Sequence, residues 1–211
     1  MEKSGADQLE EDKKLPNDIT LTSVWKSFSL FVIIAMIIII VFHGEGRLTY
    51  IKHLWLSDAV HIDIVVGGFI GVGFTGLIVL LYYLTNLSLP KNEYTRLIRK
   101  MLYKKFGIFT IAFGAGFSEE ILFRGAILGL LIMYIGAAPA LLIVSFIFMA
   151  LHIPQYKGNI FIHVIVFGMG MILGGLFIWT EALWAPVAAH VTYNGLMARL
   201  MKKQDQAQTV T

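Results

Sequence analysis

Six long stretches of apolar residues, separated by short polar segments, dominate the pattern of this chain. A helix needs about 20 apolar residues, within a range of about 17 to 25, to cross a bilayer. The pattern therefore predicts an all-α protein, a polytopic membrane helix bundle with about six transmembrane helices. The third stretch is longer than one span requires, and the fourth is shorter. The predicted spans are residues 24–42, 59–87, 106–134, 137–151, 159–180 and 183–200.

Composition supports the membrane class and excludes several kinds of chemistry. Hydrophobic residues make up 57% of the 211 residues and charged residues only 15%, whereas soluble domains carry about 25% charged residues. The net charge of +3 is small, so the basic residues are expected to orient the chain in the membrane and not to bind nucleic acid. The chain has no cysteine, which excludes disulfides, thiolate metal sites and a cysteine nucleophile.

The Lys and Arg residues predict the orientation of the bundle. With six spans and the N-terminus inside, only Arg47 and Lys52 of the 17 Lys and Arg residues fall on the outer side, and Arg124 falls within a span. Positive residues concentrate on the cytoplasmic side, so both termini are predicted to be cytoplasmic and the protein to lie in the cell membrane.

The polar residues 1–23 predict a disordered tail. No A-x-A-like site follows residues 24–42, so this run is predicted to be a retained span.

Glycines predict where helices pack closely. Small residues four apart let two helix backbones approach each other in a membrane. Gly114 and Gly116 are expected to let the overlong third span bend. Three further pairs have the packing spacing: Gly67 with Gly71, Gly125 with Gly129, and Gly170 with Gly174.

Three ionisable residues, Glu119, Glu120 and Arg124, lie within the apolar third span. A charge near the bilayer centre costs about 2.5 to 3.5 kcal/mol, so such groups face the protein interior or water. Glu120 and Arg124 are four residues apart and share a helix face, which predicts an ion pair. Glu119 points about 100° away around the helix. Since the pair leaves Glu119 without a partner on its own helix, Glu119 is the candidate for chemistry.

Polar groups that Glu119 can meet come from two later spans. His152 ends the sequence FMALH at 148–152, and His190 shares a helix face with Asn194 in HVTYN at 190–194. Glu119 and His152 each lie about 16 residues from the turn at 135–136, so in an antiparallel hairpin both lie roughly 24 Å from that turn. His190 is only about seven residues from its own connector. It can join them only if the turn at 135–136 extends beyond the turn near residue 183.

The stretches EEILFR (119–124), FMALH (148–152) and HVTYN (190–194) resemble the three ordered motifs EExxxR, FxxxH and HxxxN. These motifs belong to the CAAX protease and bacteriocin-processing membrane proteins, a family that includes the type II CAAX prenyl endopeptidase. The resemblance covers about residues 106 to 200. It implies an all-helical intramembrane endopeptidase of the glutamate type, whose substrates are peptides or membrane proteins in contact with the lipid bilayer.

The resemblance also implies roles for individual residues. Glu119 is expected to be the catalytic base, and His152 to help activate the attacking water. His190 and Asn194 are expected to form the oxyanion site. Glu120 and Arg124 are expected to support the site structurally.

Two alternatives concern the chemistry of this site. Ser118 lacks a G-x-S-x-G context, and the chain has no H-E-x-x-H zinc motif. No cofactor is therefore expected. In the alternative, zinc is held by Glu119, His152 and His190, three ligands that leave a position for water.

The domain organisation follows from the motifs. After the tail at 1–23, residues 24–105 hold two transmembrane helices and a basic cytoplasmic loop. Residues 106–200 form the catalytic membrane core, and 201–211 form the C-terminal tail.

Two non-protease functions compete with the interpretation as a protease. One is a non-enzymatic protein that confers bacteriocin immunity or scaffolds a partner, and the other is a transporter with a proton relay. The chain has no internal repeat of the kind that transporters carry.

Overall fold

The computed structural model describes residues 19–85, 90 and 92–208, and all regular secondary structure in these residues is helical. The predicted all-α helix bundle is confirmed. Most of the predicted tail at 1–23 lies outside the described residues, and the last helix continues into the predicted tail at 201–211. The separate helices are α2 (Leu21–Phe42), α3 (Arg47–His53), α4 (Val60–Thr85), α5 (Glu93–Leu102), α9 (Ala137–Leu151), α10 (Ile160–Thr180) and α11 (Trp184–Gln208), with a 3₁₀ turn η1 (Gly44–Gly46).

The third predicted span is a composite helix at 107–135 whose hydrogen-bonding pattern changes along its length. Two of its five sections are π-helical, and π-helical turns are frequent at functional sites. They hold more residues in each turn than an α-helix does, which accommodates the excess length noted in the sequence. The sections are α6 (Gly107–Phe109), π-helical η2 (Thr110–Ala115), α7 (Gly116–Glu120), π-helical η3 (Ile121–Leu128) and α8 (Gly129–Ile135).

Three helices in the described part of the chain are long and apolar enough to cross a membrane, namely α2, α4 and α10. The helix α9 is apolar but shorter. Every stretch predicted as a span is helical over most of its length. The composite helix is divided by its π-helical sections, and α11 has a polar second half, so the number six remains a prediction.

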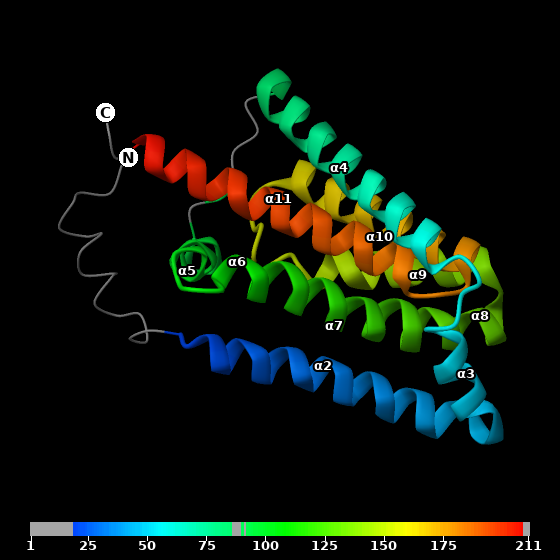
Figure 1. Ribbon diagram of the computed structural model, residues 1–211. Helices are drawn as coiled ribbons and strands as arrows, with labels where there is room; N and C mark the ends of the chain where they lie inside the picture. Colours follow the sequence, from blue (N-terminus) through cyan, green and yellow to red (C-terminus); the bar gives the residue numbers. More distant parts are fainter. Residues whose placement is uncertain (1–18, 86–89, 91, 209–211) are drawn as a thin grey trace.

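The helices alternate in direction across the bundle (Figure 1). The start of α2, the short helix α5 and the end of α11 lie at the left of the view, whereas α3 and α8 lie at the right. The helix α11 packs along α4 on one side and along η2 and α7 on the other, and α9 pairs with α10. Because α11 packs against α7, side chains from the first and third motifs can meet inside the bundle.

The glycine pairs pack as the spacing predicts. A Cβ atom on Gly67 would lie 2.2 Å from the carbonyl oxygen of Ala185, and one on Gly174 would lie 2.4 Å from Leu141 Cδ1. Gly114 and Gly116, expected to permit a bend, instead make room for Phe28 and Val191. These glycines let helices approach closely, and the π-helical sections account for the irregular course of the third span. The other positions at which a Cβ would crowd a neighbouring helix include Gly71, Gly125, Gly129 and Gly170.

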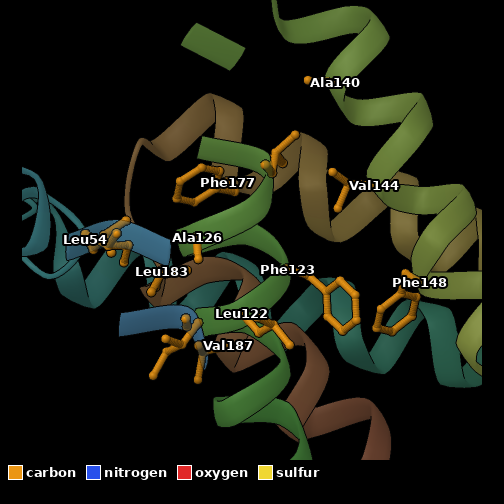
Figure 2. Packing of buried hydrophobic residues seen from close by; sticks show 14 of the residues in the cluster. Leu54, Leu122, Phe123, Ala126, Ala140, Val144, Phe148, Phe177, Leu183 and Val187 are labelled. Atoms are coloured by element: carbon orange, nitrogen blue, oxygen red, sulfur yellow. The ribbon is translucent and has the colours of Figure 1, made fainter. Parts of the chain in front are cut away.

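The main apolar core surrounds the middle of the composite helix (Figure 2). Phe123 and Phe148 meet edge to face there, with ring centroids 5.1 Å apart. Leu122 and Ala126 of the composite helix pack in the same cluster as Val187 of α11. This core holds the section of the composite helix that carries the ionisable residues.

Candidate active site

Glu120 and Arg124 form the predicted ion pair, and both side chains are fully buried. Arg124 Nη1 donates to Glu120 Oε1 at 2.9 Å. A second nitrogen, Nη2, donates to the backbone carbonyl of Gly170 on α10 at 3.2 Å. Burial without water makes such a pair costly to break on one side only, so the pair ties the composite helix to α10.

His190 completes this group from α11. Its Nδ1 lies 2.6 Å from Glu120 Oε1, the oxygen that also accepts from Arg124. A carboxylate oxygen paired with a guanidinium is an acceptor, so His190 Nδ1 carries the hydrogen and donates it. The sequence predicted Arg124 as the partner of Glu120 and did not predict His190. Through this contact, Glu120 of α7 orients the ring of His190 on α11.

The Phe148 ring lies among the charged groups of the site. Its centroid is 4.7 Å from Arg124 Cζ and 4.7 Å from the His152 ring centroid. The His190 ring lies edge-on at 6.1 Å. Phe148 is only 1% exposed. One aromatic side chain of the second motif therefore contacts residues of all three motifs and excludes water from the buried ion pair.

Glu119, next to Glu120 in sequence, lies in a different environment. Its side chain is only partly buried, yet its Oε2 atom is buried without a hydrogen-bond partner. Buried carboxylate oxygens are normally hydrogen-bonded. A carboxylate oxygen left without a protein partner is available to a water molecule or a substrate. The prediction that the ion pair leaves Glu119 unpaired agrees with this geometry.

His152 caps the end of α9 and is oriented by its own helix. Its Nδ1 lies 2.7 Å from the carbonyl oxygen of Phe148. A carbonyl only accepts, so Nδ1 carries the hydrogen and the neutral ring presents Nε2 as an acceptor. An acceptor nitrogen of this kind can orient a water molecule.

Tyr156 lies against His152, and sequence reasoning missed it. Its ring stacks parallel to the His152 ring, with 6.3 Å between centroids. Burial raises the pKa of the Tyr156 hydroxyl above its usual range, and the nearby charges of Tyr193 and Glu119 raise the pKa further. Tyr156 follows His152 by four residues, but Pro154 lies between them, so no helical spacing pointed to it.

Asn194 lies one helical turn after His190 on α11 and is partly buried. Its neighbour Tyr193 packs edge to face on Phe74 of α4, with ring centroids 5.2 Å apart. The third motif therefore borders the buried ion pair through His190 and packs against α4 through Tyr193.

Comparison with known proteins agrees with the motifs. Residues 102–196 match the family model described as type II CAAX prenyl endopeptidase Rce1-like. Over these residues the family resemblance is confirmed. No curated protein and no solved structure matches the chain. The segment that matches the Rce1-like family begins at the end of α5 and includes all three motifs, whereas α2, α3 and α4 lie outside it.

The zinc alternative requires Glu119, His152 and His190 to come together around one metal ion. Among the residues that the structure describes, no three His, Asp or Glu side chains come together as a group that could hold a metal ion. In this arrangement, Glu119, His152 and His190 do not form a three-ligand metal site.

Proposed function

We propose that this protein is a membrane endopeptidase that cleaves peptide bonds with a water molecule activated at Glu119 and His152. Membership of residues 102–196 in the Rce1-like family supports a CAAX-type membrane endopeptidase in general. One structural observation carries the choice of base. Of two adjacent glutamates, Glu120 is fully buried and held through Oε1 by Arg124 and His190, although its Oε2 has no partner. Glu119 is only partly buried, and no such pair holds it, so its carboxylate is the one that a water molecule can reach.

In the proposed reaction, Glu119 acts as general base. Its carboxylate takes a proton from water while the water oxygen attacks the peptide carbonyl carbon, and the carbonyl electron pair moves to oxygen. The tetrahedral intermediate then collapses, the C–N bond breaks, and Glu119 returns the proton to the leaving nitrogen. His152 Nε2 accepts a second hydrogen bond from the water and orients it.

The oxygen that becomes negatively charged needs hydrogen-bond donors. Each well-placed donor contributes roughly 10²- to 10³-fold to turnover. The amide of Asn194 is one such donor in this proposal. His190 is the second, because its Nδ1 is bonded to Glu120 and its Nε2 donates when the ring is doubly protonated. Glu120 then serves as the counter-ion of that ring.

The substrate class follows from the position of the site among apolar helices. We propose membrane-associated proteins or peptides as substrates. The match of residues 102–196 to an endopeptidase family model favours an enzyme over an immunity or scaffold protein.

The proposed orientation places both termini in the cytoplasm. Reporter fusions at Thr211 and within residues 43–58 should report opposite sides of the membrane. If both fusions report the same compartment, the six-span arrangement is wrong.

The decisive experiment compares two chemically identical substitutions. Purified protein in detergent is assayed with a library of quenched fluorescent peptides, with and without a chelator. Glu119→Gln should lower turnover roughly 10²- to 10⁴-fold. Glu181→Gln, at an exposed glutamate beyond the end of α10, should leave turnover unchanged. Turnover that survives Glu119→Gln would eliminate the glutamate mechanism, and turnover lost to the chelator and restored by zinc would favour the metal alternative.

A comparison of membrane proteomes addresses the substrate. Cells that produce the wild-type protein are compared with cells that produce Glu119→Gln. Peptides that appear only with the wild-type protein identify the cleavage sites. If the two proteomes are the same under conditions where the purified enzyme cleaves library peptides, the physiological substrate is absent from those membranes.

A further inference from the structure

Tyr156 lies in the segment between α9 and α10, and its hydroxyl is held on one side only. Gln155 Nε2 donates to the Tyr156 hydroxyl oxygen at 2.8 Å. The hydroxyl oxygen is thus an acceptor in this bond, and its own hydrogen remains available for donation. The ring is anchored by stacking on His152 and by contact with the main apolar core.

The segment that carries Tyr156 is itself anchored to the short helix α5. Asn92 Nδ2 donates to the backbone carbonyl of Gln155 at 2.7 Å. The same residue caps α5, because Asn92 Oδ1 accepts from the Thr95 backbone at 3.0 Å. The Asn92 side chain therefore caps the start of α5 and also holds the segment before Tyr156, so two hydrogen bonds fix the position of that segment against α5.

We propose that Tyr156 is a further catalytic residue, which donates its hydroxyl hydrogen to the carbonyl oxygen that becomes negatively charged. This inference rests on the proposed function. The Tyr156 ring stacks on His152, one of the two groups assigned to the attacking water, and the charge of Glu119, the other group, acts on the Tyr156 hydroxyl. A donor at this place bonds to the oxygen of the same carbonyl that the water attacks.

The two imidazoles of the site, His152 and His190, show why the reacting carbonyl oxygen needs a neutral hydrogen-bond donor. The neutral His152 ring presents only an acceptor at Nε2, because its hydrogen is bonded to the Phe148 carbonyl. The neutral His190 ring is equally restricted by its bond to Glu120. A hydroxyl keeps its donor hydrogen without any change of charge, so Tyr156 and Asn194 remain donors when both rings are neutral.

The test uses Tyr156→Phe, which removes one oxygen atom and keeps the ring that stacks on His152. Peptides that the wild-type protein cleaves from the quenched library serve as probes. We expect kcat to fall roughly 10²-fold, KM to change by less than about twofold, and thermal stability in detergent to be nearly unchanged. Tyr134→Phe, at an exposed tyrosine near the end of α8, is the matched control and should behave as the wild type.

The anchor offers a second variant that does not touch the ring. Asn92→Asp keeps the oxygen that caps α5 and removes the nitrogen that holds the Gln155 carbonyl. We expect a smaller fall in kcat, of about tenfold or less, with the helix intact by circular dichroism. This variant also keeps the proposal testable if Tyr156→Phe fails to accumulate, because an unchanged kcat would then contradict the anchored donor.

The outcomes separate this inference from the proposed function. If the wild type cleaves no peptide, or Glu119→Gln cleaves as well as the wild type, the proposed function fails. If Glu119→Gln is inactive and Tyr156→Phe has full kcat, only the role of Tyr156 is overturned. A rise in KM with unchanged kcat would also overturn it, because Tyr156 would then bind substrate and transition state equally.

Discussion

Two adjacent glutamates of one helix lie in opposite environments. Glu120 is completely buried, and its Oε1 accepts hydrogen bonds from Arg124 and His190. Each glutamate has an Oε2 atom without a partner, but Glu119 is only partly buried and has no ion pair like that of Glu120. A rotation of about 100° around the helix axis separates the two side chains. The same chemical group is thus structural at one position and available for reaction at the next.

This difference indicates what keeps a charged residue inside an apolar bundle. Glu120 stabilises the fold by linking the composite helix to α11 through His190, and its partner Arg124 links the same helix to α10 through the Gly170 carbonyl. The Glu119 group contributes no such link, so its burial costs stability that the fold must supply elsewhere. The two groups should therefore respond differently to the same substitution, with turnover and stability affected separately.

The largest expected effect is the loss of turnover in Glu119→Gln without a loss of stability. Removing a general base lowers turnover roughly 10²- to 10⁴-fold, or about 3 to 5 kcal/mol of barrier. Neutralising a carboxylate that has a buried, unpartnered oxygen should leave the melting temperature in detergent unchanged or higher. A melting temperature well below that of the wild type would show that Glu119 has a structural partner.

The complementary substitution, Glu120→Gln, should act mainly on stability. It leaves Arg124 buried without its counter-ion, and breaking a buried pair on one side typically costs about 3 to 5 kcal/mol. Protein level and melting temperature should fall, and Glu120→Gln combined with Arg124→Met should partly restore them. A single variant as stable as the wild type would mean that His190 and Gly170 suffice to hold this region.

Asn194→Ala sharpens the comparison from the side of α11. If the Asn194 amide donates to the reacting oxygen, turnover should fall about 10²- to 10³-fold, or about 2.7 to 4 kcal/mol. The melting temperature should change little. His61→Ala, at an exposed histidine near the start of α4, provides a control that should retain both properties. Full turnover in Asn194→Ala would remove this residue from the oxyanion site.

The smallest expected effect concerns Tyr50, which supports the composite helix from α3. The Tyr50 hydroxyl donates to the Gly125 carbonyl in π-helical η3 at 2.5 Å. Tyr50→Phe leaves that carbonyl without this donor, which should cost about 1 to 3 kcal/mol of stability. Turnover per folded molecule should remain near that of the wild type. A large fall in turnover at normal stability would instead show that η3 sets the position of Glu119.

Patterns local to one helix were sufficient for much of the fold. The apolar stretches placed α2, α4, α9, α10 and most of α11, because lipid-facing and core-facing positions must both be apolar along a span. The four-residue spacing predicted the bond between Glu120 and Arg124, and the glycine pairs predicted close packing. Each of these inferences depends only on the geometry of a single helix.

Contacts between distant segments were decided by the tertiary structure alone. His190 lies 70 positions from Glu120 in the chain, and only the tilt and register of α11 against α7 bring the two together. Tyr156 stacks on His152 across a turn that contains Pro154, where helical periodicity does not apply. The sequence determined which polar side chains enter the apolar bundle, since lipid makes each of them conspicuous. The packing of the helices determined which of these side chains pair, and it placed Glu120, and not Glu119, between Arg124 and His190. Hydrogen bonds act over about 3 Å, and no sequence spacing specifies side-chain positions that closely across two helices.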